Sequence, residues 1–225
     1  MHADLVLNTL LSTYHVSLDQ LKTDGSSRKP YFGIRLPELM KVAKTIMQHD
    51  PVLFLETNPL EIYEMEIIQT YVIGMIKDLS LSIPYFISFA HHTKDWSTTD
   101  SLCQHFRLAK RHPDQVFEII ESFVGSNDEF LERIVAVMIL SHFLKEPDVK
   151  QSLAILDQLR HPGYYTKMAV AWALATMMVN HSEICLEYMK QNRLDPWTHN
   201  KAIQKTVESF RVKESDKDQM KALKR

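Results

Sequence analysis

The amino-acid sequence predicts an all-α protein made of repeated helix pairs, and three observations support this. Glycine is scarce, since the 225 residues include only 5 glycines, where ordinary usage gives about 16. Breaks in the helical pattern recur at intervals of 33 and 34 residues. The segments between the breaks carry apolar residues at helical spacing. Parallel α/β folds and β-sandwiches need glycine at positive φ and at close backbone approaches, so the composition argues against them.

The N-terminal part is expected to hold three helices. The first covers about Ala3–Leu21, and a polar linker from Lys22 to Pro30 follows it. Two further helices, near Leu36–His49 and Leu60–Lys77, are expected to form a pair with a longer connection. Gly74 falls inside the second of these, where close packing is the only account that the sequence offers.

A regular array follows these helices. The first helix of each pair is expected to begin near Leu81, Asp114, Asp148 and Ser182, and the second, 15 or 16 residues later, near Trp96, Glu129, Tyr164 and Thr198. The boundaries carry helix-start chemistry, because proline precedes aspartate at Pro113 and Pro147, and Asp195 offers an N-cap before an N1 proline.

Apolar residues form helical stripes within the array. One first helix carries Val116, Ile119, Ile120 and Phe123 on one face. The segment from Tyr164 to Val179 is apolar almost all round, as expected of a helix packed on both sides. Repeats of roughly 20–50 residues with two helices each indicate an α-solenoid. We therefore expect an α-α superhelix of about five helix pairs plus an N-terminal helix, with an irregular helical bundle as the alternative.

The whole chain, residues 1–225, is expected to form a single domain. Residues 1–30 hold the N-terminal helix and linker, residues 31–212 the repeat array and residues 213–225 a basic tail. The formal net charge is −2, so overall charge does not indicate nucleic-acid binding. From His199 to Arg225, however, there are 8 Lys or Arg and only 4 Asp or Glu. This basic end either contacts phosphate or is a solvated tail.

The sequence gives no indication of a metal site, a membrane span or secretion. Cys103 and Cys185 are too far apart for a metal-binding spacing or a disulfide framework, which suits a reducing cytosol. The eleven histidines include no i, i+4 pair of the kind that binds zinc on one helix face. Asp4 interrupts any signal-peptide pattern, and no apolar run is long enough to span a bilayer. We expect a cytoplasmic monomer that needs no cofactor.

The segment from Lys94 to Asp100 carries the first candidate site. Trp96 and Asp100 are four residues apart at the start of a second helix and therefore share one face. An aromatic ring beside a carboxylate suits a cationic ligand, because the ring face attracts the cation and the carboxylate neutralises it. The alternative is a core tryptophan and an exposed aspartate that favours the helix dipole.

Arg133 and Trp172 lie in the next two second helices. Because successive repeats place such helices side by side, all four residues are candidates to line one surface. Arg133 stands within an apolar run and needs either a partner or a wet groove, since burying it unpaired is costly. The alternatives are a salt bridge for Arg133 and core packing for Trp172. Trp197, next to Pro196, is interpreted as a packing residue only.

Four stretches of the chain resemble the AlkD-like family of DNA alkylation repair proteins, which are HEAT-like repeat DNA glycosylases. They are Phe32-Gly-Ile-Arg-Leu-Pro-Glu-Leu-Met-Lys-Val-Ala-Lys44, the Trp96-to-Asp100 segment, Glu132-Arg-Ile-Val-Ala136 and Tyr164-Tyr-Thr-Lys-Met-Ala-Val-Ala-Trp172. Each motif alone is modestly specific. The ordered set, with its matching repeat period, covers about residues 31–210 and is much more specific.

The resemblance implies excision of N3- and N7-alkylated purines from duplex DNA bound in the concave groove, as part of base excision repair. The positive charge of such a base makes it a good leaving group, so the protein must chiefly stabilise a developing cationic sugar and guide a water. Asp100 resembles the carboxylate that does this. Trp96 and Trp172 resemble the aromatic pair that packs against the damaged nucleotide, and Arg133 resembles the phosphate-contacting residue of the same cleft.

The chain departs from this family before its Gly-Ile motif. Family glycosylases usually carry two helices there, and the second helps to grip the damaged duplex. The polar run from Lys22 to Pro30 takes that place, so the chain looks truncated in its lesion-recognition part. Two functions therefore stay open: a DNA glycosylase, and a HEAT-like scaffold or binding module without glycosylase activity.

A local basic patch is expected to supply the DNA contacts that the overall charge does not. Its members are Arg35, Lys41, Lys44, Lys110 and Arg111, with Arg28 and Lys29 nearby in the sequence. Alternatively, Lys41 and Lys44 form only the solvated face of their helix.

Overall fold

A computed structural model describes residues 1–23, 29–145 and 149–225. The chain forms two compact units, Met1–Leu108 and Ala109–Arg225, which we describe separately. Regular structure among the described residues is helical throughout, apart from one isolated bridge between Lys22 and Tyr31. The all-α prediction is therefore confirmed.

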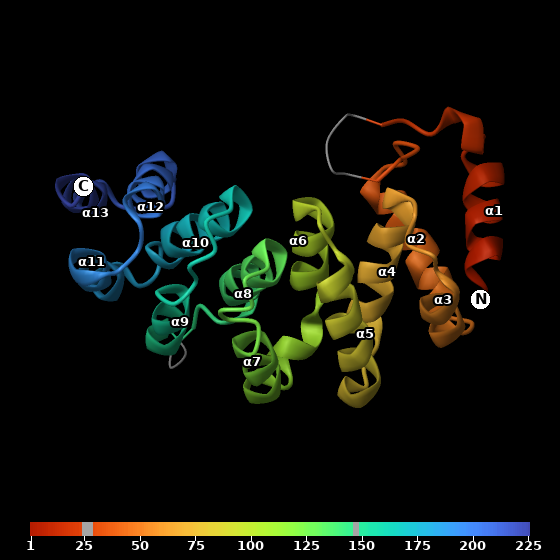
Figure 1. Cartoon of the computed structure of the whole chain (residues 1–225), viewed down its shortest axis with the longest axis horizontal. Coiled ribbons are helices and arrows are strands. Elements are labelled where there is room, and N and C mark those ends of the chain that lie inside the picture. Colours follow the sequence, from red (N-terminus) through yellow and green to blue (C-terminus); the bar gives the residue numbers. More distant parts are fainter. Residues whose placement is uncertain (24–28, 146–148) are drawn as a thin grey trace. The chain divides into compact units, whose positions relative to one another are not determined.

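In its described residues, the first unit contains six α-helices and the short 3-10 helix η1 (Figure 1). They are α1 (Ala3–Thr13), η1 (Leu18–Gln20), α2 (Leu36–Met47), α3 (Pro51–Thr57), α4 (Tyr63–Met75), α5 (Leu79–His92) and α6 (Trp96–His105). A second 3-10 helix, η2 (Arg107–Lys110), follows α6. Helix α4 packs between α2 and α6, while α1 packs on α3 and α5 on α4. Because α4 has neighbours on both sides, nearly all of its side chains are buried.

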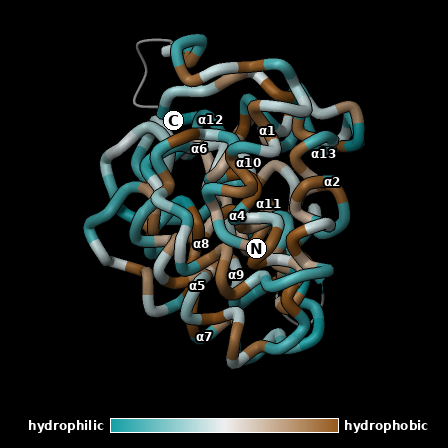
Figure 2. Tube along the Cα trace, turned by 90° about the vertical axis from the view of Figure 1, so that its right-hand side faces the viewer, coloured by the Kyte–Doolittle hydropathy of each residue, from teal (hydrophilic) through white to brown (hydrophobic). Residues whose placement is uncertain are grey.

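The described part of the second unit repeats this arrangement with seven α-helices. They are α7 (Pro113–Glu121), α8 (Glu129–His142), α9 (Val149–Leu156), α10 (Tyr164–Met177), α11 (Ser182–Gln191), α12 (Pro196–Glu208) and α13 (Glu214–Ala222). Helix α10 packs between α8 and α12, and each of α7, α9 and α11 contacts a neighbouring second helix. The trace in Figure 2 alternates between hydrophobic and hydrophilic stretches, as amphipathic packing requires.

The helix starts of the array agree closely with the predicted period. First helices begin at Leu79, Pro113 and Ser182, and second helices at Trp96, Glu129, Tyr164 and Pro196. Asp195 is the N-cap of α12 and accepts from the backbone N–H groups of Trp197 and Thr198, as expected. Pro147 and Asp148 lie outside the described residues, so the predicted helix start there has no structural counterpart to compare.

Three details of the N- and C-terminal parts differ from the prediction. The first helix ends at Thr13 instead of Leu21, where His15 takes a positive φ of 52° that a helix cannot continue. A short helix missed in the sequence, α3, begins after the N-cap Asp50 and pairs with α4. The expected basic tail contains α13, which packs on α12 and α11 and buries Met220.

Buried carboxylates join neighbouring repeats. Glu64 of α4 is fully buried and accepts from the backbone N–H groups of Phe32, Gly33 and Ile34, which precede α2. In the second unit, a carboxylate oxygen of Glu132 accepts from two consecutive N–H groups of the loop before α10, both at 2.9 Å. These bonds satisfy backbone N–H groups of the two loops, and they tie each loop to the neighbouring helix.

Gly74 allows α4 and α6 to approach each other. A Cβ atom at this position would lie 2.3 Å from the carbonyl oxygen of His105. The ring of His105 also packs edge-on against Tyr71, with ring centroids 4.5 Å apart. Close packing, the account expected from the sequence, therefore explains this mid-helix glycine.

Candidate functional site

The start of α6 carries two of the predicted site residues. Asp95 caps this helix, because its side chain accepts from the N–H groups of Ser97 and Thr98 at 2.8 and 3.3 Å. Trp96 is the first residue of the helix, and Asp100 follows one turn later on the same face. The sequence prediction did not assign the cap, although Asp95 has the residue type that caps a helix most favourably.

The exposed fractions of Trp96 and Asp100 are the reverse of those that the packing alternative requires. Trp96 is 43% exposed, whereas Asp100 is only 8% exposed. The idea of a core tryptophan with an exposed first-turn aspartate is therefore wrong. The face presents an accessible aromatic ring beside a carboxylate that is largely removed from water.

Hydroxyl contacts fix α6 against α4. The Ser97 Oγ donates to the Tyr63 hydroxyl at 3.2 Å, and the hydroxyls of Thr70 and Ser101 lie 2.6 Å apart. These pairs hold the first two turns of α6 in register with α4. They therefore determine the direction in which Trp96 and Asp100 point.

Helix α4 also carries a buried carboxylate, Glu66, which has two partners from other segments. The Glu66 carboxylate, 4% exposed, lies 3.2 Å from the Lys29 ammonium and 2.9 Å from His92 Nε2. Lys29 also donates to the carbonyl oxygen of Leu60. This cluster ties the segment before α2 to α4 and α5, so Lys29 has a structural partner and is not a free phosphate-binding lysine.

Arg133 and Trp172 belong to the second unit, on the adjacent helices α8 and α10. Arg133 is 6% exposed; its Nη1 donates to the Tyr165 carbonyl at 2.8 Å, and its guanidinium lies 5.9 Å from the centroid of the Tyr165 ring. Trp172 is half-buried. The structure thus brings Trp96 and Asp100 together in the first unit, and the helices of Arg133 and Trp172 together in the second.

The predicted basic residues are all exposed. Arg35 is the N-cap residue of α2, and Lys41 and Lys44 follow on the same helix. Lys41 forms an ion pair with Glu38 at 3.0 Å, and Glu38 also accepts from the Tyr14 hydroxyl. Lys110 is the last residue of η2, Arg111 lies between η2 and α7, and Arg28 is outside the described residues.

A comparison with known families matches most of the chain. The family described as DNA alkylation repair enzyme matches residues 17–206. The chain belongs to this family. The match covers all four motif stretches that carry the resemblance noted in the sequence. No curated protein and no solved structure matches the chain.

This family member also exposes an aromatic and basic surface that sequence reasoning missed. Trp197, interpreted as a packing residue only, is 40% exposed, and Tyr164 is 58% exposed. Their rings meet edge to face with centroids 5.9 Å apart. The ammonium groups of Lys167 and Lys201 lie 6.0 and 5.6 Å from the Trp197 centroid. The signal in the sequence was that both aromatics stand in the first turn of a second helix.

The cap of α12 orients this surface. Burial raises the pKa of Asp195, but bonds from the hydroxyl and N–H of Thr198 and the nearby Lys167 ammonium together lower the pKa below its ordinary value. The Lys167 Nζ lies 3.4 Å from Asp195 Oδ1. An ionised cap therefore holds both the start of α12 and one of the two lysines beside Trp197.

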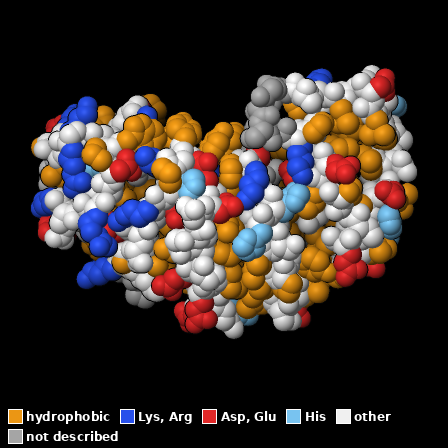
Figure 3. Space-filling model, in the orientation of Figure 1, with side chains coloured by type: hydrophobic (Ala, Val, Ile, Leu, Met, Phe, Trp, Pro, Cys, Tyr) orange, Lys and Arg blue, Asp and Glu red, His pale blue; other side chains and the backbone are white. Residues whose placement is uncertain are grey.

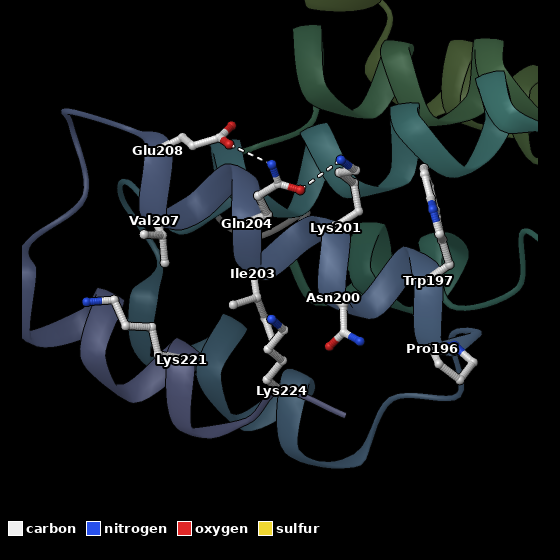
Figure 4. A pocket seen from close by; sticks show the side chains of 10 residues that line it. All are labelled: Pro196, Trp197, Asn200, Lys201, Ile203, Gln204, Val207, Glu208, Lys221 and Lys224. Carbon is white, nitrogen blue, oxygen red and sulfur yellow. Dashed lines mark hydrogen bonds between the residues drawn. The ribbon is translucent and has the colours of Figure 1, made fainter.

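A cleft lies between α12 and α13 (Figure 4). Its volume is about 580 Å³, and its walls combine apolar side chains with lysines and amides. The lining includes Trp197, Lys201, Ile203, Lys221 and Lys224. In Figure 3 lysine and arginine side chains gather over these C-terminal helices, in agreement with the local excess of basic residues.

Two further observations concern metals and membranes. No group of three or more His, Cys, Asp or Glu is arranged to hold a metal ion in the described ranges. Both cysteines are buried, and burial raises the pKa of the Cys185 thiol to about 12. No helix in the described part of the chain combines the length and hydropathy needed to cross a bilayer.

Proposed function

We propose that this protein is a DNA glycosylase that removes N3- and N7-alkylated, cationic purines from duplex DNA in base excision repair. Membership of the DNA alkylation repair enzyme family supports DNA as the substrate. The observation that carries the proposal is the face of α6, where an accessible Trp96 stands one turn from the buried carboxylate of Asp100.

The chemistry follows from the substrate's own charge. A cationic base departs as a neutral molecule, so the enzyme has little protonation to perform. As the N-glycosidic bond breaks, positive charge develops on the sugar. A carboxylate that is mostly shielded from water stabilises that charge more strongly than an exposed one, because the local dielectric is lower.

The other site residues receive supporting roles. Asp100 also orients the water that attacks the anomeric carbon, and Trp96 and Trp172 pack against the damaged nucleotide. Arg133 contacts a phosphate or, because it is buried on Tyr165, positions the start of α10. Arg35, Lys41, Lys44, Lys110 and Arg111 contribute phosphate contacts that position the duplex. The protein acts as a cytoplasmic monomer and needs no cofactor.

A base-release assay tests the proposal directly. Wild type is incubated with duplex containing N7-methylguanine, and free base is quantified. Asp100→Asn is expected to lose at least about 100-fold in rate. Asp114→Asn is the matched control, because Asp114 is an exposed aspartate in the first turn of α7. No release at high enzyme excess, together with no duplex affinity at low salt, would overturn the glycosylase proposal.

The second candidate is a HEAT-like binding module without glycosylase activity. Two observations favour it: η1 is the one helix among the described residues between α1 and α2, and Lys41 and Lys29 are engaged by Glu38 and Glu66. Both observations leave fewer groups available to contact a DNA duplex. This candidate predicts DNA or protein binding that Asp100→Asn leaves unchanged, with no base released by wild type.

A further inference from the structure

We propose that Tyr164 and Trp197 form a stacking platform for an unpaired nucleotide, with Lys167 and Lys201 contacting its flanking phosphates. We call these four residues the Trp197 platform. The inference rests on the proposed function only in taking DNA as the ligand. It adds a single-strand contact on helices α10 and α12, outside the set of residues assigned to base release.

The platform unites the two groups that bind single-stranded nucleic acid without reading its sequence. Exposed aromatic rings stack on bases, and flexible cations neutralise the backbone. Both rings are large and exposed, at 58% for Tyr164 and 40% for Trp197. Rings as exposed as these contribute little to the hydrophobic core. Because the two rings adjoin each other on the surface, a binding role explains their exposure.

The two lysines are placed to exchange partners. Each ammonium lies about 6 Å from the Trp197 centroid. Lys201 Nζ also donates to the Gln204 amide oxygen at 2.8 Å, and Lys167 pairs with Asp195. A base that stacks on the Trp197 ring displaces one lysine ammonium from the ring. That ammonium then forms an ion pair with the adjacent phosphate.

Figure 4 shows the orientation that this requires. Trp197 and Lys201 project in the same direction from α12, and Gln204 and Glu208 continue the same row. The Gln204 amide links the Lys201 ammonium to the Glu208 carboxylate through two hydrogen bonds. The row is therefore ordered along the helix, with its cationic end next to the ring.

Ring contacts connect the platform to the proposed site. Tyr164 meets Tyr165 edge to face at 5.5 Å, and Tyr165 receives the Arg133 guanidinium on its ring. An unbroken series of contacts therefore runs from Arg133 to Tyr165, Tyr164 and Trp197 within the second unit. A strand engaged near Arg133 has an aromatic surface along which its bases can continue.

The test is the affinity for a fluorescein-labelled single-stranded oligothymidylate, measured by anisotropy at low salt. Trp197→Ala is expected to weaken binding roughly tenfold, the worth of about one stacked base, with Trp197→Phe in between. Phe210→Ala is the matched control, because Phe210 is a fully exposed aromatic of the same unit. Lys201→Gln and Lys167→Gln are each expected to reduce the slope of log affinity against log salt by about 0.7.

Intrinsic fluorescence gives a second measurement that does not depend on the stability of Trp197→Ala. The variant Trp96→Phe/Trp172→Phe retains Trp197 as its only tryptophan. Its emission is expected to be quenched as oligothymidylate is added. Absence of quenching, or equal affinities for wild type, Trp197→Ala and Lys201→Gln, would overturn the platform. So would binding of polyglutamate at the platform in preference to oligothymidylate.

The outcome separates this proposal from the glycosylase proposal. If Asp100→Asn abolishes base release but Trp197→Ala leaves single-strand affinity unchanged, the platform is rejected and the glycosylase stands. If wild type releases no base but binds oligothymidylate through Trp197, the glycosylase is rejected and the platform stands.

Discussion

Arg133 of α8 holds Tyr165 of α10 in two ways, by a 2.8 Å hydrogen bond from Nη1 to the carbonyl oxygen and by its guanidinium 5.9 Å from the ring centroid. The backbone N–H of Tyr165 donates to the carboxylate of Glu129, which also belongs to α8. The start of α10 is therefore fixed to α8 at both its N–H and its C=O. We predict that Arg133→Ala destabilises the second unit by about 2–3 kcal/mol, because a charged hydrogen bond and a cation–π contact are both lost.

Urea unfolding followed by circular dichroism measures this effect. Arg133→Met is the control, since it keeps much of the aliphatic volume and removes only the charge and its donors. A variant that loses DNA binding while unfolding at the wild-type urea concentration would contradict the positioning role and favour a direct phosphate contact.

Acid is expected to weaken the second unit through Asp157. Burial raises the pKa of this carboxyl, but hydrogen bonds from the Arg193 N–H and guanidinium and from the Tyr188 hydroxyl together lower the pKa below the ordinary 3.8. The folded state therefore binds this proton less tightly than the unfolded state does. The stabilisation is present above the ordinary pKa and is lost as the pH falls through the lowered folded value.

The comparison of wild type with Asp157→Asn checks this prediction. The difference in their free energies of unfolding is expected to be about 1–3 kcal/mol at neutral pH and to shrink as the pH falls below the ordinary pKa of 3.8. A difference that stays constant with pH would show that the charge of Asp157 is irrelevant.

Gly74→Ala is expected to destabilise the first unit by about 1–3 kcal/mol, although alanine favours helices. The added methyl would lie 2.3 Å from the backbone oxygen of His105, and backbone cannot move aside as a flexible side chain can. Gly125→Ala is the comparison, because its Cβ meets nothing within 4 Å and its φ of +73° costs only about 1 kcal/mol. Thermal melts that rank Gly125→Ala as the more damaging change would disprove the packing account.

Asp95→Ala is expected to cost about 1 kcal/mol of stability and to lower the rate of base release. The reason is that the Asp95 cap fixes the first turn of α6, which carries Trp96. Asp95→Asn retains a good cap and is expected to keep most of both properties. The comparison uses melting temperatures alongside the base-release rate. If Asp95→Asn lost release as fully as Asp100→Asn, the charge of Asp95 would itself take part in the reaction.

Local signals predicted most of the helices. The 33–34-residue period and the Asp and Pro residues at helix starts located α5 to α8 and α10 to α12 closely, because caps and apolar stripes act within a few residues of each other. The same chemistry at Asp50-Pro51 marked α3, but a helix of 7 residues is too short for a periodic stripe to be recognised.

The candidate site was located by sequence and characterised only by structure. Spacing alone placed Trp96 and Asp100 on one helix face. Their exposures, 43% and 8%, depend on how α6 packs on α4, which involves Tyr63 and Thr70 from another repeat. The Trp197 platform escaped prediction for the same reason, since Tyr164 and Trp197 are far apart in sequence and meet only because α10 packs on α12.

The sequence by itself determined the helical class, the repeat period, the family and the residues that bear the proposed chemistry. These depend on residue type and near-neighbour spacing. The tertiary structure alone decided which of those residues face water, because burial is set by contacts between helices that are remote along the chain. It made Asp100 a shielded carboxylate, turned the predicted tail into α13 and changed Trp197 from a packing residue into an exposed ring between two lysines.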